Sequence, residues 1–251
     1  YQGAPSSVTA FMAVGAKVGG FAALMRIFVS ALGVLAIDFT AVLWGLAALT
    51  MILGNIVAIS QKNIKRMLAY SSIAQAGYIM MALVPYGQKE IMTDVIAAAL
   101  LYLIAYAVMN FAAWAVVIAM EKAEGKGLEI SDYAGLGRKY PVLAAIMTVS
   151  MLSFTGIPPT LGFIGKFYLF RSVVDGGFIG LAVLGVLTSL ASAYYYLRVV
   201  VNMYMKDGEP TVHRDNWVYL TAAVAGVGMI ILGIFSLPLL NWAYQAAISA
   251  F

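Results

Sequence analysis

Two long runs without a charged residue constrain this chain more than any other feature. Residues 41–60 and 217–241 contain no Asp, Glu, Lys or Arg. Crossing the hydrocarbon core of a bilayer takes roughly 20 helical residues, and a helix satisfies its own backbone hydrogen bonds there. Charged residues make up only 10% of the 251, against about 25% in an average soluble protein. The sequence therefore predicts an all-α, polytopic transmembrane helical bundle.

Apolar segments of spanning length recur along the chain and predict a single transmembrane domain over residues 1–251. The seven expected spans cover residues 6–29, 38–60, 64–84, 93–120, 141–170, 178–204 and 217–237. Residues 238–251, which include Trp242 and Tyr244, are expected to form an interfacial tail. The chain opens with YQGAP and no initiator Met, so we expect it to be the later part of a longer polypeptide.

Basic residues in the loops predict the orientation in the membrane. Alternate loops hold nine of them: Lys62, Lys65, Arg66, Lys122, Lys126, Arg138, Lys139, Lys206 and Arg214. The loops between hold only Lys89 and Arg171. Because cytoplasmic loops carry the excess of Lys and Arg, the chain should start on the cytoplasmic side and end outside. This distribution also explains the net charge of +4 without a nucleic-acid partner.

The residue types present exclude several kinds of chemistry. The sequence has no cysteine, which rules out disulfides, thiolate-bound zinc or iron–sulfur clusters and a thiol nucleophile within this chain. The only histidine, His213, lies in a polar loop beside Arg214 and Asp215. We therefore expect no metal site and no cofactor bound by this chain.

The fifth span contains a predicted helix break at Gly156, Pro158 and Pro159. Two consecutive prolines remove two N–H donors and clash with the preceding turn. Broken helices at membrane depth often line a polar cavity or a binding site in transporters. A proline kink that serves packing, or a loop between two short helices, is the structural alternative.

Two lysines are predicted to lie far from the ends of their spans. Lys17 falls about halfway along the first span, and Lys166 follows the predicted break. A lysine at mid-membrane costs about 2.5–3.5 kcal/mol on insertion scales, so it is seldom retained without a use. Burial can lower the pKa of a lysine by several units, whereas an arginine stays charged. Both lysines are therefore candidate proton-relay residues, with snorkelling to an interface as the alternative.

Uncharged polar residues on two neighbouring spans could complete a polar path. Ser71 and Gln75 share one helical face of the third span, and Tyr102 and Tyr106 share one face of the fourth. Hydrogen bonding between helices is the alternative role for each of them. No Asp or Glu is expected deep in any span.

Four stretches resemble the C-terminal half of subunit N of the proton-pumping NADH:quinone oxidoreductase (respiratory complex I), a member of the antiporter-like subunit superfamily. They are residues 1–5 (YQGAP), 63–73 (NIKRMLAYSSI), 156–167 (GIPPTLGFIGKF) and 193–198 (AYYYLR). The second and third are specific to the superfamily, and the third followed by the tyrosine triplet points to subunit N.

The resemblance implies half of an inverted-repeat fold of about fourteen helices. Residues 1–30 would be the last helix of the first repeat and 38–204 the second repeat, with its broken helix at 141–170; 205–251 would form the C-terminal helix and tail. It also implies that Lys17 and Lys166 belong to a midplane proton path. Gln75 stands where the family often has a histidine, so the resemblance gives it no titrating role.

The function implied by the resemblance is proton translocation in a redox-driven pump of a bacterial plasma membrane. Partners would be the other membrane subunits, the lipid bilayer and the N-terminal half of the same subunit. NADH, flavin, iron–sulfur clusters and quinone are expected in other subunits. Two alternatives remain: a cation/proton antiporter subunit of the multisubunit sodium/proton type, and a membrane scaffold whose lysines are structural.

Overall fold

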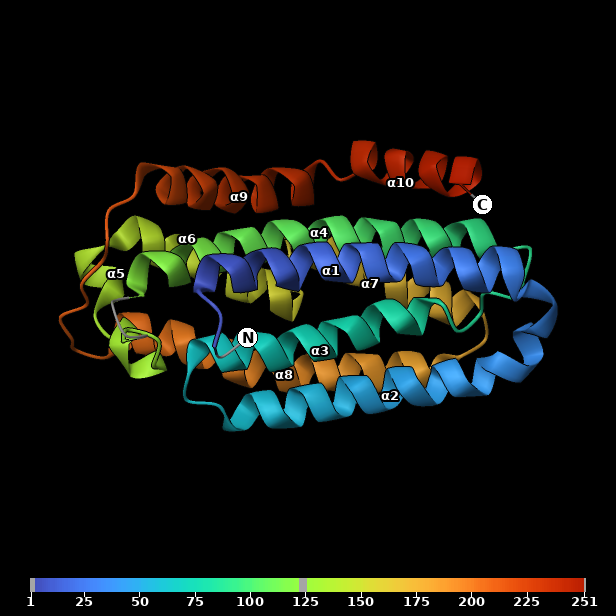
Figure 1. Cartoon of the computed structure of the whole chain (residues 1–251), viewed down its shortest axis with the longest axis horizontal. Helices are drawn as coiled ribbons and strands as arrows, with labels where there is room; N and C mark the ends of the chain where they lie inside the picture. Colours follow the sequence, from blue (N-terminus) through green and yellow to red (C-terminus); the bar gives the residue numbers. More distant parts are fainter. Residues whose placement is uncertain (1–2, 122–125, 251) are drawn as a thin grey trace.

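The computed structural model describes residues 3–121 and 126–250, which form long helices joined by turns (Figure 1). Within the described residues no β-strand forms, apart from an isolated bridge between Asn63 and Glu129. The predicted all-α fold is therefore confirmed. Four residues named in the sequence analysis lie outside the described residues: Tyr1, Gln2, Lys122 and Phe251.

Among the described residues, five helices are long and apolar enough to cross a membrane. They are α1 (Ser6–Arg26, continued by the π-helical η1, Ile27–Ala31), α2 (Ala36–Ser60), α4 (Met92–Met120), α8 (Ile179–Met205) and α9 (Asn216–Ile234). Each coincides with one of the seven predicted spans. A short 3-10 turn, η2 (Gly33–Leu35), joins the first two.

The other two predicted spans are a polar helix and a broken one. Helix α3 (Ile64–Ala82) carries Lys65 and Arg66 in its first turn and packs along α2. The fifth predicted span is two helices, α6 (Pro141–Thr155) and α7 (Leu161–Asp175), separated where the proline pair predicts a break. Each half has 15 residues, about 22 Å of helix, which is short of the bilayer core.

Helix α4 lies at the centre of the bundle. It packs against α1, α3, α6, α7, α9 and α10, and most of its side chains are buried. Large apolar side chains such as Leu49, Leu190 and Val224 instead face outward from α2, α8 and α9. Apolar side chains on the outside are expected of helices whose solvent is lipid.

The predicted tail is a helix. Helix α9 ends at Ile234, and α10 (Leu237–Ala250) continues along α4 (Figure 1), where the Tyr244 hydroxyl donates a hydrogen bond to Asp94. At Gly233, a Cβ atom would lie 2.2 Å from the carbonyl oxygen of Pro159, so α9 reaches the break between α6 and α7. The interfacial position of residues 238–251 stays a prediction.

The loops that carry most of the basic residues form one end of the bundle. The beginnings of α3 and α9 lie there, together with α5 (Leu136–Lys139), in Figure 1. A 3-10 turn, η4 (Ile130–Tyr133), is held nearby by a hydrogen bond of 2.8 Å from the Ile130 N–H to the Lys62 carbonyl. Ion pairs Arg138–Asp207 and Lys139–Glu209 tie α5 to the loop before α9.

Candidate functional site: two lysines and a broken helix

The break between α6 and α7 follows directly from its sequence. In an unbroken α-helix the carbonyls of Phe154 and Thr155 would accept hydrogen bonds from the N–H groups of residues 158 and 159. Both positions are proline, which has no N–H group. Gly156 ends α6 with φ of 90°, a left-handed conformation that favours glycine. Two backbone carbonyls at the end of α6 are thus left without helical partners.

The ammonium group of Lys166 donates hydrogen bonds to both of these carbonyls. Its Nζ lies 2.7 Å from the oxygen of Phe154 and 3.1 Å from that of Thr155. A third donor goes to the hydroxyl of Ser189 on α8, at 2.6 Å, and the ammonium lies 4.7 Å from the centre of the Tyr78 ring. Only 3% of Lys166 is exposed. All three ammonium hydrogens therefore have acceptors, although no carboxylate is among them.

Lys17 occupies a comparable uncharged polar setting against α3 and α4. This half-buried side chain donates to the Ser72 hydroxyl at 2.8 Å, to the Tyr106 hydroxyl at 3.1 Å and to the Ser72 carbonyl. Its Nζ also lies 4.2 Å from the centre of the Tyr106 ring. Helices α1, α3 and α4 together position this amine.

The predicted polar path forms a second cluster between the two lysines. The Tyr102 hydroxyl donates to Oε1 of Gln75, whose Nε2 lies 3.1 Å from the Tyr196 hydroxyl and 3.4 Å from the Phe154 carbonyl. Ser71 hydrogen bonds with the same Tyr196 hydroxyl. The Phe154 carbonyl therefore accepts from both Gln75 and Lys166.

One helical turn separates this cluster from Lys17. On α4, Tyr102 belongs to the Gln75 cluster and Tyr106 contacts Lys17. On α3, Ser72 contacts Lys17 and Gln75 lies three residues later. The structure thus brings together all the side chains of the predicted path in two adjoining groups.

Sequence reasoning missed the contribution of α8. Ser189 and Tyr196 are seven residues apart and lie on one helical face of α8. The Ser189 hydroxyl accepts a hydrogen bond from Lys166, and the Tyr196 hydroxyl accepts one from Gln75. The repeat of polar residues at 189, 192 and 196 along one face of this helix is the signal that could have located them. The Phe154 carbonyl is a backbone group, so its own residue type does not mark it as part of the site. Only the proline four residues later indicates that this carbonyl lacks a helical hydrogen-bond donor.

A pocket borders each lysine cluster. A cavity of about 620 Å³ is lined by Lys65, Arg66 and Ser72, at the bundle end where α3 begins. Another, of about 370 Å³, is lined by Lys166, Ser189 and the break residue Gly156, between α7 and α8. Among the described residues, no three His, Cys, Asp or Glu side chains gather closely enough to hold a metal ion.

The fold and the site together define a class of protein. It is a polytopic helical membrane protein in which the amines of two lysines lie among uncharged polar groups, one of them at a broken helix. The family model for the NADH:quinone oxidoreductase and Mrp antiporter transmembrane region matches residues 1–192. The chain therefore belongs to the family of antiporter-like membrane subunits, and the resemblance found in the sequence is confirmed.

Curated relatives carry a consistent name. The chain is 46% identical over 252 aligned residues to NADH-quinone oxidoreductase subunit N of Trichlorobacter lovleyi, covering 98% of this chain and 50% of that protein. It is 42% identical to the subunit N of Moorella thermoacetica, covering 100% of this chain and 52% of that protein. The chain thus spans about half the length of the curated relatives it matches.

Solved structures share the fold. A chain of respiratory complex I from Thermus thermophilus with bound aureothin superposes with a TM-score of 0.82 at 34% identity, over 96% of this chain and 52% of that one. A chain of the Mrp complex from Dietzia sp. gives a TM-score of 0.84 at 21% identity, over 97% and 53%. The second likeness shows the fold alone.

Proposed function

We propose that this chain is the proton-translocating half of a subunit of NADH:quinone oxidoreductase, in which Lys17 and Lys166 pass protons along the membrane interior. The observation that carries the proposal is the setting of Lys166. A proline-broken helix supplies two carbonyls to a buried amine without any carboxylate, so the amine can lose its proton without leaving an unpaired anion behind. The names of the relatives favour this reading over a sodium/proton antiporter.

Entry from the cytoplasm is supported by the pocket beside Lys17. The cavity lined by Ser72 opens at the bundle end where the basic loops gather, which the positive-inside rule assigns to the cytoplasm. Ser72 accepts a hydrogen bond from Lys17. A proton that reaches the Ser72 hydroxyl can therefore be passed to the amine in one step.

Transfer between the lysines would use the polar cluster of Gln75. The hydroxyls of Tyr106, Tyr102 and Tyr196 can each accept and donate a hydrogen bond. The Phe154 carbonyl cannot carry a proton and serves to orient both Gln75 and Lys166. Charge on one lysine disfavours charge on the other in a poorly polarisable interior, so protonating Lys17 would promote release from Lys166.

Release would follow the cavity beside the break. Lys166 lines this space with Gly156 and Ser189, and α7 runs from there toward the bundle end opposite the basic loops (Figure 1). We assign that end to the outside of a bacterial plasma membrane, with the C-terminus also outside. Other subunits of the complex would supply the NADH, flavin, iron–sulfur and quinone chemistry.

The boundaries of the repeats belong to the same proposal. Residues 1–30 correspond to the end of the first repeat, 38–204 to the second repeat, and 205–251 to the C-terminal helices. The broken helix, α6 and α7, then falls inside the second repeat. The N-terminal half of the same subunit would pack against the outer faces of α1 and α3.

Replacing Lys166 with methionine in the assembled complex tests the proposal. Methionine has a similar length and no titrating group, so the complex should assemble while proton pumping and coupled NADH oxidation fall by about 10²-fold, the lower range for a positioned proton-transfer group. Lys206→Met removes an exposed lysine next to α8 and should leave both rates unchanged. Normal pumping in an assembled Lys166→Met complex would show that Lys166 is not a relay residue.

A further inference from the structure

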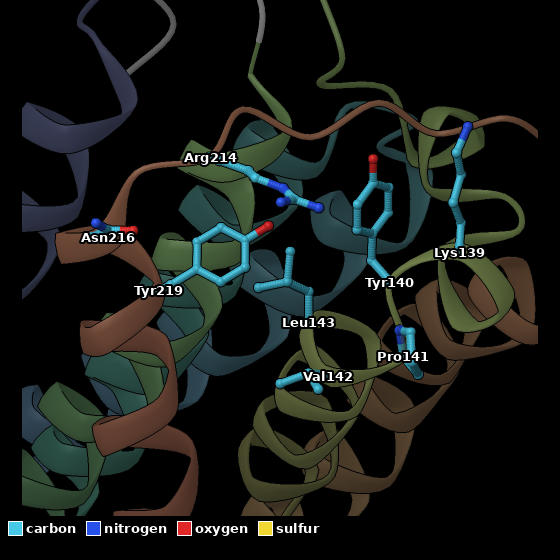
Figure 2. Close-up of a pocket in the computed structure, with 8 residues that line it drawn as sticks. All are labelled: Lys139, Tyr140, Pro141, Val142, Leu143, Arg214, Asn216 and Tyr219. Atoms are coloured by element: carbon cyan, nitrogen blue, oxygen red, sulfur yellow. The ribbon is translucent and has the colours of Figure 1, made fainter.

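A pocket of about 420 Å³ lies between the beginnings of α6 and α9, at the end of the bundle that carries the basic loops (Figure 2). It is far along both helices from the lysine clusters and has no part in the proposed relay. Its lining comes from three segments: the end of α5, the first turn of α6, and the loop and first turn of α9.

The pocket exists because α6 and α9 contact each other several residues after they begin and diverge toward their N-termini. A Cβ atom on Gly226 would lie 3.1 Å from Cγ1 of Ile146, so α9 and α6 are in close contact there. Ile146 is five residues into α6, whereas Gly226 is ten residues into α9. Above this contact the space between the helices is open, and Val142 is 65% exposed.

A cation without a carboxylate partner faces this space. Figure 2 shows the Arg214 guanidinium pointing into the pocket between the rings of Tyr140 and Tyr219. Among the described residues, no carboxylate forms an ion pair with Arg214. The neighbouring Asp215 caps α9 by accepting from the Trp217 N–H at 2.8 Å.

The second cation at the rim is already neutralised in part. Lys139 pairs with Glu209 at 2.6 Å, and this hydrogen bond raises the pKa of Lys139 and lowers the pKa of Glu209. Asp207, another acid of this loop, pairs with Arg138. The acids close to the pocket are therefore engaged, which leaves the Arg214 guanidinium to meet an external anion.

Several of the remaining polar groups of the pocket can donate hydrogen bonds, and Asn216, whose carboxamide both donates and accepts, also lines it. The hydroxyls of Tyr140 and Tyr219 border it, and the first turn of α6 contributes backbone N–H groups without helical partners at Val142 and Leu143. A guanidinium fork with hydroxyl and amide donors suits an oxyanion, and phosphate oxygens above all. The side chains of Pro141, Val142 and Leu143 make the inner wall apolar.

We propose that this pocket binds the phosphate of an anionic phospholipid headgroup, with the acyl chains lying against α6 and α9. Free inorganic phosphate would use the same donors, but the apolar inner wall and the exposed apolar faces of both helices match a lipid. Basic pockets between transmembrane helices at the cytoplasmic side are a general means of holding anionic headgroups. The bound lipid would fasten α9 to the broken helix at α6.

Lipid binding to the complete complex tests the proposal. The complex is purified in detergent, depleted of lipid and titrated with phosphatidylglycerol, and lipid bound per complex is counted by native mass spectrometry. Arg214→Gln should weaken binding at one site by about tenfold, the loss expected for a charge-assisted hydrogen-bonding pair. Arg214→Lys should lose less, because it keeps the charge but not the fork.

Lys206→Gln is the matched control, since it removes one positive charge from the same loop outside the pocket. Equal weakening by Lys206→Gln and Arg214→Gln would overturn the proposal in favour of diffuse surface attraction. Parallel titrations with phosphatidylcholine and with inorganic phosphate separate the sources. Arg214-dependent binding of phosphatidylglycerol above both supports the proposal, and Arg214-dependent binding of inorganic phosphate alone would refute the lipid.

Discussion

Replacing Gln75 with leucine removes the carboxamide that connects Tyr102, Tyr196 and the Phe154 carbonyl. Gln75 is fully buried, and leucine fills a similar volume without hydrogen-bonding atoms. Tyr102 loses the acceptor of its hydroxyl, whereas Tyr196 keeps its hydrogen bond with Ser71. One buried hydroxyl left without a partner costs about 1–3 kcal/mol.

The same loss should slow proton transfer if the path runs through this cluster. A barrier raised by about 1–3 kcal/mol corresponds to a rate about 5- to 150-fold lower, at about 1.36 kcal/mol per tenfold. The assay is NADH-driven acidification of proteoliposomes that contain the assembled complex, with NADH oxidation measured in parallel. Pumping should fall by that factor, and coupled oxidation should fall with it.

Asn202→Leu is the matched control. Asn202 is also buried and donates a hydrogen bond to the Ile130 carbonyl, near the basic loops and away from either lysine. It should lower stability by a similar amount and leave pumping per assembled complex unchanged. Normal pumping in the Gln75→Leu complex, or equal losses in both variants, would refute a path through Gln75.

Substitutions at two further positions separate fixed charge from a mobile proton and backbone conformation from side-chain chemistry. Lys17→Arg keeps a permanent charge and Lys17→Ala removes it, so a relay should lose pumping in both; normal turnover with arginine would mean that Lys17 supplies charge only. Gly156→Ala forces a Cβ into a left-handed residue, at a cost of about 1–2 kcal/mol, and places it 3.0 Å from Cδ of Lys166. Its melting temperature and pumping should both fall, and unchanged values for both would contradict the role given to the break.

Composition and spacing were sufficient for the parts of the fold that depend on local chemistry. Apolar segments of spanning length, two of them free of charge, located the five long helices, because a lipid environment demands apolar side chains and internally bonded backbone. The prolines at 158 and 159 located the break for the same local reason: they remove two specific N–H donors. Lys166 could be singled out because a lysine at that depth is costly.

Contacts between distant segments could not be read in this way. Ser189 and Tyr196 join the site because α8 packs beside α3 and α6. The polar spacing within α8 marks one face of this helix, but it does not specify which helices that face meets. The hydrogen bond between Gln75 and the Phe154 carbonyl depends on how α3 and α6 approach each other. Similarly, the sequence alone favours a span that continues to residue 237, whereas α9 ends at Ile234, beside the close approach of Gly233 to Pro159.

The central claim is that Lys17 and Lys166 act in series on one proton path, and the ratio of protons pumped to electrons transferred tests it most directly. The measurement compares Lys17→Ala, Lys166→Met and the double variant in assembled complexes. Two steps in series predict that the double variant pumps as poorly as the worse single variant and no worse. A double variant that pumps with the normal ratio, or losses that add as for two independent parallel paths, would contradict the account.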